Sequence, residues 1–294
     1  MPVAQPRHLW PGRYMTSALH PGDPLVVVED VHLTLGSAAG PVNILRGVSL
    51  EISCGEVVAL TGPSGSGKSS LMMVLGGLER PNRGSVRVAG RDLGTLGEDA
   101  LARLRRAEIG IVFQSFHLIA TMTALENVAL PRELAGDRGA FDAAAQGLAA
   151  VGLAHRLRHY PAQLSGGEQQ RVAIARAFIA GPRLILADEP TGNLDGATGA
   201  QIVDYLFEHQ ARHRTTLLLI THDAGLAVRC GRRIALADGQ IVEHRGIAQT
   251  PPDTAPPDTA PPDTAPPDTE RHDMTRHDTA RRDAERRGGA RRGW

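Results

Sequence analysis

The chain has 294 residues, which is enough to bury a full hydrophobic core in one large domain or two small ones. Its 32 basic and 32 acidic residues leave no formal net charge, which excludes a polycation that binds nucleic acid through charge alone. With 41% hydrophobic and 22% charged residues, the composition also excludes a chain that is disordered throughout. We therefore expect one compact α/β unit with tails.

Residues 1–23 predict a flexible N-terminal extension. They are rich in Pro, His and Gly, and they show no hydrophobic periodicity. They also lack the apolar segment of a secretory signal, and no apolar run in the chain approaches the roughly 18 to 20 residues that a membrane-spanning helix needs. We expect the protein in the cytoplasm, so any role at a membrane requires a partner chain.

The folded domain is expected to span residues 24–247. It begins with short apolar or β-branched runs that are interrupted by Gly and Asn, which is typical of a mostly antiparallel sheet. The expected strands are 25–28, 31–35, 42–52, 57–60 and 86–88. A helix is expected over 68–78, and a further short strand over 109–113.

Between about residues 115 and 180 the pattern changes to Ala- and Leu-rich segments with helical periodicity. An inserted helical subdomain is therefore expected, with helices near 124–134, 141–151 and 167–179. After it, strand-like and helical segments alternate, which is typical of a parallel sheet. The expected elements are strands at 184–187, 216–220, 233–236 and 240–242 and a helix over 197–212.

The tail, residues 248–294, is a five-residue repeat that begins as PPDTA and drifts to Arg-rich units in the same register. Its Pro-Pro pairs favour an extended polyproline II rod of about 3.1 Å per residue. Residues 271–294 hold eight Arg against four acidic residues. Two interpretations stay open: a solvated disordered tail without a fixed role, and weak attraction to anionic lipid headgroups.

A glycine-rich segment fits the pattern G-x-x-x-x-G-K-[ST], follows an expected strand and opens an expected helix, which is the context this pattern requires. Its glycines let backbone N–H groups surround phosphate oxygens, and the helix N-terminus adds a positive dipole. We expect Lys68, the only lysine in the chain, to offset phosphate charge and Ser69 to bind Mg²⁺. Alone, this loop predicts only a bound nucleotide. Its residues are Gly62, Pro63, Ser64, Gly65, Ser66, Gly67, Lys68 and Ser69.

Two adjacent carboxylates, Asp188 and Glu189, follow the apolar run 184–187, which predicts a buried strand. At the end of that strand Asp188 can hold Mg²⁺ directly or through water, and Glu189 can accept a proton from an attacking water. An acidic pair after a buried strand can instead cap a helix, but the loop upstream favours the catalytic interpretation.

The string Leu164-Ser-Gly-Gly-Glu-Gln-Gln-Arg171 resembles the LSGGQ signature of the ABC ATPase family, with Glu168 in the variable position. The resemblance implies an α/β fold, namely a P-loop NTPase (RecA-like) core with an antiparallel β subdomain and an inserted helical subdomain. It also implies an ATPase that acts as a homodimer or an ABC heterodimer. In such a dimer Ser165, Gly166 and Gly167, at a helix N-terminus, complete the γ-phosphate site of the other subunit and exclude water.

Further family motifs follow in order. Gln114 matches the Q-loop glutamine, which senses Mg²⁺ and the attacking water, and His222 matches the switch histidine, which contacts the γ-phosphate. Asp195 ends a string that matches the D-loop of the dimer interface. The resemblance extends from about residue 25 to residue 245. It implies catalytic roles for Glu189, His222 and Gln114. It also implies that Ser69, Gln114 and Asp188 bind Mg²⁺.

One position departs from the family pattern. The residue that stacks on adenine is usually aromatic, and the best placement here puts Leu35 at that position. An aliphatic contact would bury the base with less stacking, so weaker nucleotide affinity and selectivity are expected. Ser70, where the family often has Thr, belongs to the same nucleotide site and is expected to be benign.

Within the family, strings such as Phe113-Gln-Ser-Phe-His-Leu-Ile and Glu189-Pro-Thr-Gly-Asn-Leu-Asp look most like the lipoprotein-release and macrolide-export branch. That branch drives separate membrane permeases, which implies a peripheral position on the inner face of the cell membrane and a permease contact over 116–128. A regulatory ABC ATPase that gates cell-wall hydrolases through a permease-like partner would share every motif. A non-transport ABC ATPase that works on DNA or ribosomes typically carries coiled-coil insertions or two cassettes, which are not present here, so no nucleic-acid partner is expected.

Overall fold

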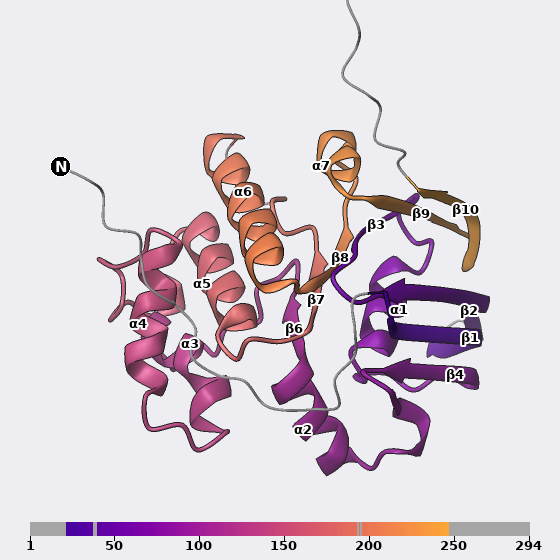
Figure 1. The fold of residues 1–294 in the computed structure, drawn as a ribbon, viewed down its shortest axis with the longest axis horizontal. Coiled ribbons are helices and arrows are strands. Elements are labelled where there is room, and N and C mark those ends of the chain that lie inside the picture. The colour runs from indigo at the N-terminus through magenta and orange to yellow at the C-terminus, as the bar shows by residue number, and fades with distance from the viewer. Residues whose placement is uncertain (1–21, 38–39, 193, 195, 247–294) are drawn as a thin grey trace, which may run out of the picture. The chain divides into compact units, whose positions relative to one another are not determined.

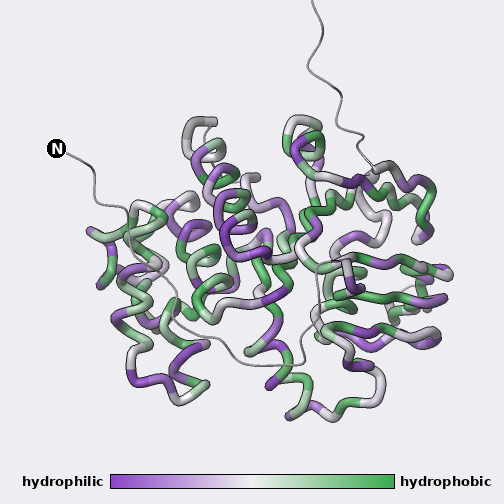
Figure 2. The backbone as a smooth tube through the Cα atoms, viewed as in Figure 1, coloured by the Kyte–Doolittle hydropathy of each residue, from purple (hydrophilic) through white to green (hydrophobic). Residues whose placement is uncertain are grey.

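The structure is a computed structural model that describes residues 22–37, 40–192, 194 and 196–246. Of the expected N-terminal extension, 1–23, residues 1–21 lie outside the described residues, and so does the whole expected tail, 248–294. The described chain forms two sheets and a group of helices (Figure 1). Figure 2 shows hydrophobic residues along the strands of both sheets and a mixture of hydrophobic and hydrophilic residues along the helices.

The first sheet is antiparallel and has the strand order β2-β1-β4-β5. In β2, Val48, Leu50 and Ile52 are buried while the residues between them are exposed, because alternate side chains of a strand point to opposite faces. The two strands expected over 25–28 and 31–35 form one strand, in which register shifts around Asp30 absorb the break. The strands are β1 (Pro24–Ser37), β2 (Gly40–Ser53), β4 (Arg83–Val88) and β5 (Arg91–Asp92).

The second sheet has the order β10-β9-β3-β8-β7-β6 and is parallel except for the β9–β10 hairpin. Every residue of β7 and β8 is buried, because side chains on one face pack in a core shared with the antiparallel sheet and those on the other face pack against helices. The strands are β3 (Val57–Thr61), β6 (Ile109–Val112), β7 (Leu184–Asp188), β8 (Thr216–Ile220), β9 (Arg232–Ala237) and β10 (Gln240–Gly246).

Seven α-helices accompany the sheets in the described residues. Two of them, α2 and α7, were not expected from the sequence. Helix α2 is strongly charged, and among its apolar residues only Leu101 and Leu104 are well buried; α7 has six residues and depends on the Asp223 side chain, which accepts from the N–H groups of Gly225 and Leu226. The helices are α1 (Lys68–Leu75), α2 (Glu98–Glu108), α3 (Ala124–Glu133), α4 (Ala140–Ala150), α5 (Gly166–Phe178), α6 (Gly196–His213) and α7 (Ala224–Arg229).

The inserted helical subdomain has its own core, formed where α3, α4 and α5 pack together. Helix α3 begins with a reciprocal cap in which Thr123 Oγ1 accepts from Glu126 N and Thr123 N donates to Glu126 Oε2. Helix α5 belongs to two cores, since Ile174 and Phe178 pack with the parallel sheet while Val172 and Ile179 pack with α3 and α4. Helix α5 therefore joins the helical subdomain to the parallel sheet.

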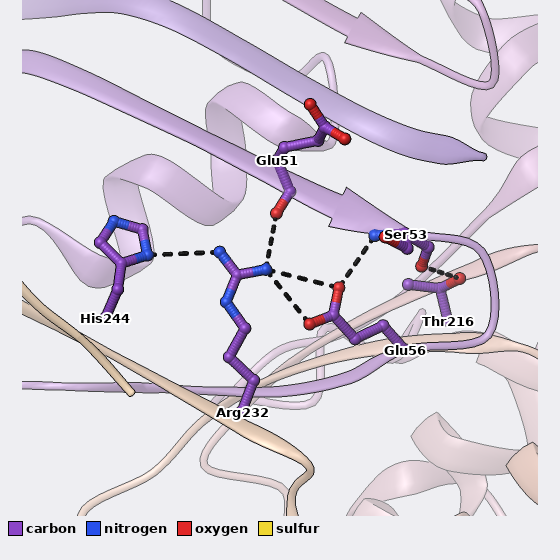
Figure 3. A network of polar contacts seen from close by, with 6 residues as sticks. All are labelled: Glu51, Ser53, Glu56, Thr216, Arg232 and His244. Carbon is purple, nitrogen blue, oxygen red and sulfur yellow. Dashed lines mark hydrogen bonds and ion pairs between the residues drawn. The ribbon is translucent and has the colours of Figure 1, made fainter. Parts of the chain in front are cut away.

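A polar network fastens the β9–β10 hairpin to the antiparallel subdomain (Figure 3). Arg232 Nη1 donates to the carbonyl oxygen of Glu51 at 2.9 Å and to Glu56 Oε1 at 3.1 Å, and Arg232 Nη2 donates to His244 Nδ1 at 3.2 Å. Glu56 Oε2 accepts from Ser53 N at 2.9 Å. The arrangement of antiparallel sheet, parallel sheet and helical insertion agrees with the fold class expected from the sequence.

Candidate functional site

The glycine-rich loop leaves the carboxyl end of β3 and enters α1, as the sequence predicted. Gly62 and Gly67 have φ values of +143° and +99°, in the region that favours glycine. A Cβ at Gly62 would lie 2.0 Å from the carbonyl oxygen of Leu236, and one at Gly67 would lie 2.9 Å from the carbonyl oxygen of Ile44. At Gly65 a Cβ would meet no atom within 4 Å, so the outer side of the loop faces open space.

Lys68 starts α1 and folds back over the loop. Its Nζ donates to the carbonyl oxygens of Gly62 at 3.0 Å and Pro63 at 2.7 Å. The N-cap residue of α1 is Gly67, whose lack of a side chain leaves the first N–H groups of the helix without a side-chain cap from that position. A cationic side chain and a helix N-terminus therefore converge on the space enclosed by the loop, which suits a phosphate group.

Ser69, the next residue of α1, joins the loop to the end of β7. Its Oγ donates to Asp188 Oδ2 at 2.6 Å, although the two residues are 119 positions apart in the sequence. Asp188 is the last residue of β7 and is only 7% exposed. A hydroxyl and a carboxylate oxygen at this distance fit a Mg²⁺ ion that takes its other ligands from water and substrate phosphates.

Among the described residues, no three His, Cys, Asp or Glu side chains gather as a metal site. Mg²⁺ does not require such a group, because it commonly binds through one or two protein oxygens together with phosphates. The loop, Lys68 and the oxygens of Ser69 and Asp188 therefore fit a nucleotide with its metal ion.

Glu189 follows directly and has an unusual backbone. Its φ is +48°, a conformation that is uncommon for a non-glycine residue and that costs about 1 to 3 kcal/mol. A bond from Glu189 N to the carbonyl oxygen of Ile220 at 3.0 Å holds this turn against the end of β8. The Glu189 side chain is 15% exposed, so its carboxylate lies largely within the protein while one oxygen meets His222.

His222 lies just beyond β8 and is 80% exposed. Its Nδ1 is 2.7 Å from Glu189 Oε1. The hydrogen bond to Glu189 and the negative charge of that carboxylate raise the pKa of His222 above its ordinary value of 6.5. The parallel order of β3, β8 and β7 thus brings the loop, both carboxylates and His222 to one edge of the sheet.

Gln114 is exposed two residues after β6, which pairs in parallel with β7, so it follows the same edge of the sheet as the two carboxylates. Leu35 lies in the antiparallel sheet, 36% exposed on β1 and opposite Val42 of β2. Asp195 is outside the described residues. Within the described chain, no hydrogen bond or ion pair joins residues 165–167 to the loop.

Ser165 is the N-cap of α5, and Gly166 and Gly167 form its first turn. Ser165 Oγ accepts from Glu168 N at 3.2 Å, while Ser165 N donates to Glu168 Oε2 at 2.8 Å. The bond from Ser165 N lowers the pKa of Glu168, and the Arg156 guanidinium, 2.8 Å from Glu168 Oε1, lowers it further. Glu168, expected only as the variable position of the signature, is thus a capping residue, which the pattern S-x-x-E could have identified.

The family model described as "ABC transporter" matches residues 45–192. The chain is 48% identical over 225 residues to the ABC transporter ATP-binding protein YbbA of Escherichia coli (strain K12), covering 76% of this chain and 99% of that protein. It is 48% identical over 221 residues to the lipoprotein-releasing system ATP-binding protein LolD of Geobacter metallireducens, covering 74% and 98%. The macrolide export ATP-binding/permease protein MacB of Chlorobium luteolum is 49% identical over 223 residues, which are 76% of this chain and 33% of that protein.

Solved structures lead to the same family. A dimeric post-hydrolysis state of the ATP-binding cassette MJ0796, bound to ADP and Pi, superposes with a TM-score of 0.72 at 38% identity and covers 76% of this chain and 99% of that one. No helix among the described residues is long and apolar enough to cross a bilayer.

Proposed function

This chain belongs to the ABC transporter family and is an ATPase cassette with the P-loop NTPase fold. We propose that two copies of it bind two ATP between them and drive separate membrane permease subunits. The 2.6 Å bond between Ser69 and Asp188 carries the proposal, because it joins the phosphate loop to the end of β7, where the two carboxylates lie. The close relation to LolD and MacB supports an export or lipoprotein-release type of transporter.

The glycine-rich loop binds the nucleotide. The backbone N–H groups of Gly62 to Ser70 surround the phosphates, and Lys68 offsets their charge from its position over the loop. The exposed side chain of Leu35 covers one face of the base. Mg²⁺, held by Ser69, Asp188 and Gln114, would neutralise phosphate charge.

Glu189 is the general base for the attacking water. Its backbone turn, held against β8 by the bond to Ile220, fixes where the carboxylate points. His222 donates to one of the two carboxylate oxygens in the structure, which leaves the other free to accept a proton. When ATP is bound, His222 exchanges Glu189 for the γ-phosphate.

Dimerisation completes each site. Ser165, Gly166 and Gly167 are exposed or partly exposed at the start of α5, where the N–H groups of a helix N-terminus can meet the γ-phosphate held by the other subunit. Asp195 would cross the same interface. Closure of the dimer pulls on the permease through the surface that includes residues 116–128, at the inner face of the cell membrane.

We further propose that the ATPase domain spans residues 24–247 and that the Arg-rich end of the tail, residues 271–294, contacts anionic lipid weakly. Eight Arg against four acidic residues support that contact.

The assignment is tested by capturing the partner. Glu189→Gln, which removes the base and retains the shape of the side chain, should trap ATP-bound dimers on their permease in native membranes. Affinity purification with ATP should then recover an integral membrane permease, and Lys68→Ala, which cannot hold the phosphates, should not recover it. Recovery of ribosomes or nucleic acid instead of a permease would refute the transport function.

A further inference from the structure

The segment after β6 makes a tight turn through two residues with left-handed backbone. Phe116 has φ +61° and His117 has φ +47°, and neither is glycine. Bonds from Phe116 N to the carbonyl oxygen of Phe113 at 3.1 Å and from His117 N to that of Ser115 at 2.6 Å close the turn. Two successive conformations of this kind persist only where the surrounding structure holds them.

Arg176 of α5 holds this turn. Its Nη2 donates to the carbonyl oxygen of Phe116 at 2.8 Å, and its Nη1 donates to that of His117 at 2.7 Å. Burial lowers the pKa of the Arg176 guanidinium, and no carboxylate of the described residues forms an ion pair with it. Each terminal nitrogen of the guanidinium therefore has one backbone carbonyl oxygen as its partner.

The ring of Phe116 lies near the other end of the same helix. A Cβ placed at Gly166 would lie 4.0 Å from Phe116 Cζ. Gly166 and Arg176 are ten residues apart on α5, which is about 15 Å along a helix. A helical side chain leans toward the helix N-terminus, so Arg176 reaches back toward Phe116 while the Phe116 ring reaches forward to Gly166. Phe116 is thus bonded to α5 through its carbonyl oxygen, and its ring lies near the start of that helix.

We propose that Arg176 is a positioning residue that couples Gln114 to Ser165–Gly167 of the same subunit. Gln114 is two residues before Phe116, so a turn bound to α5 makes Gln114 follow the movement of that helix. This inference rests on the proposed function: in the dimer, Gln114 serves the ATP of its own loop, and Ser165–Gly167 serves the ATP of the partner. Arg176 therefore links the two ATP sites, and its loss uncouples them.

The test uses the full chain and compares Arg176→Ala and Arg176→Lys with Arg105→Lys. Arg105 is the matched control because its Nη1 also donates to a backbone carbonyl oxygen, that of Gly77 at 2.7 Å, but from α2. Hydrogen exchange of peptides over 113–119 reports whether the turn is held. The ATP dependence of hydrolysis reports whether the two sites are coupled.

For the unmodified chain, we expect the dependence of hydrolysis on ATP concentration to have a Hill coefficient above one. Its upper limit is two, because the dimer has two ATP sites. Arg176→Ala should raise exchange over 113–119 by about tenfold, as expected for the loss of two hydrogen bonds, and should bring the Hill coefficient to one. Arg176→Lys should lie between, since an ammonium keeps the charge but lacks the fork. Arg105→Lys should leave both measurements unchanged.

Equal hydrogen exchange over 113–119 in Arg176→Ala and the unmodified chain would overturn the proposal. So would a Hill coefficient of one in the unmodified chain, or a Hill coefficient above one that Arg176→Ala leaves unchanged. Should Arg176→Ala not fold, the lysine variant decides by the same criteria. An unmodified chain that hydrolyses no ATP would instead refute the proposed function. In that case hydrogen exchange over 164–168 decides whether the turn and the start of α5 are coupled. Faster exchange over both 164–168 and 113–119 in Arg176→Ala supports the coupling. Unchanged exchange over 164–168 overturns it.

Discussion

Nδ1 of His222 lies 2.7 Å from Oε1 of Glu189, between residues that follow two neighbouring parallel strands, β8 and β7. The proposed base and the proposed γ-phosphate sensor are therefore partners of one another in the structure. Since His222 is 80% exposed and Glu189 only 15%, the histidine is the member of the pair that is free to move.

Glu189→Gln should slow ATP hydrolysis by about 10²- to 10⁴-fold, the usual contribution of a general base. ATP binding should survive, because the loop and Asp188 are unchanged, and size-exclusion chromatography with ATP should show a dimer. Glu98→Gln, on the exposed side of α2, is the control and should hydrolyse ATP normally. Retained turnover in Glu189→Gln would contradict the assignment of the base.

The same substitution should change the titration of His222. Glu189 raises the pKa of His222 above 6.5, so the charged contact stabilises the fold fully below the unfolded pKa and is lost as pH rises through the folded pKa. A neutral amide at position 189 removes the charge, and the pKa of His222 should fall toward 6.5. Histidine NMR titration of both proteins measures this shift; identical titration curves would show that the pair is not electrostatically coupled.

Lys68 offers a direct assay of nucleotide binding, because it is the only lysine in the chain. An amine-reactive reagent can therefore label only Lys68 and the N-terminal amine. ATP with Mg²⁺ should protect Lys68, since its Nζ lies over the loop, whereas the N-terminal amine serves as the internal control. Mass spectrometry of the peptides gives both occupancies. Equal labelling of Lys68 with and without ATP would count against its phosphate role.

Leu35→Tyr should raise ATP affinity by roughly 2- to 10-fold, because an aromatic stacking contact adds about 0.5 to 1.5 kcal/mol beyond burial. Calorimetric titration with ATP and GTP would measure both affinity and base selectivity. Val242→Tyr is the control, since Val242 is also an exposed strand residue but lies on β10. A gain of affinity that both variants share would show that Leu35 does not mark the base.

Deletion of residues 249–294 should lower binding to liposomes that contain anionic lipid and leave binding to neutral liposomes unchanged. Each Arg near such a surface contributes about 1 kcal/mol and is screened by salt, so the difference should shrink at high ionic strength. ATP hydrolysis, measured in parallel, should be the same with and without the tail. Equal sedimentation of both proteins with anionic liposomes would end the lipid proposal.

Much of the fold could be predicted because its central strands are uniformly apolar. The expected strand 184–187 is β7 without its final Asp188, and the expected strand 216–220 coincides with β8. Helix α2 was not predicted although its two buried leucines, Leu101 and Leu104, have helical spacing, because most of its other residues are charged and no apolar run marks it. The break at Asp30 led to the wrong expectation of two strands in place of β1, because a register shift and the end of a strand look alike in sequence.

The sequence alone predicted which residues bear the chemistry, since a phosphate loop, a capped signature helix and an acidic strand end are local patterns whose backbone conformation depends on neighbouring residues. Tertiary structure decided which of them meet. Ser69 reaches Asp188 across 119 positions, and Arg176 reaches Phe116 across 60. These contacts depend on the order of the parallel strands and on the packing of α5 against β6, which arise only when the buried faces of distant segments assemble.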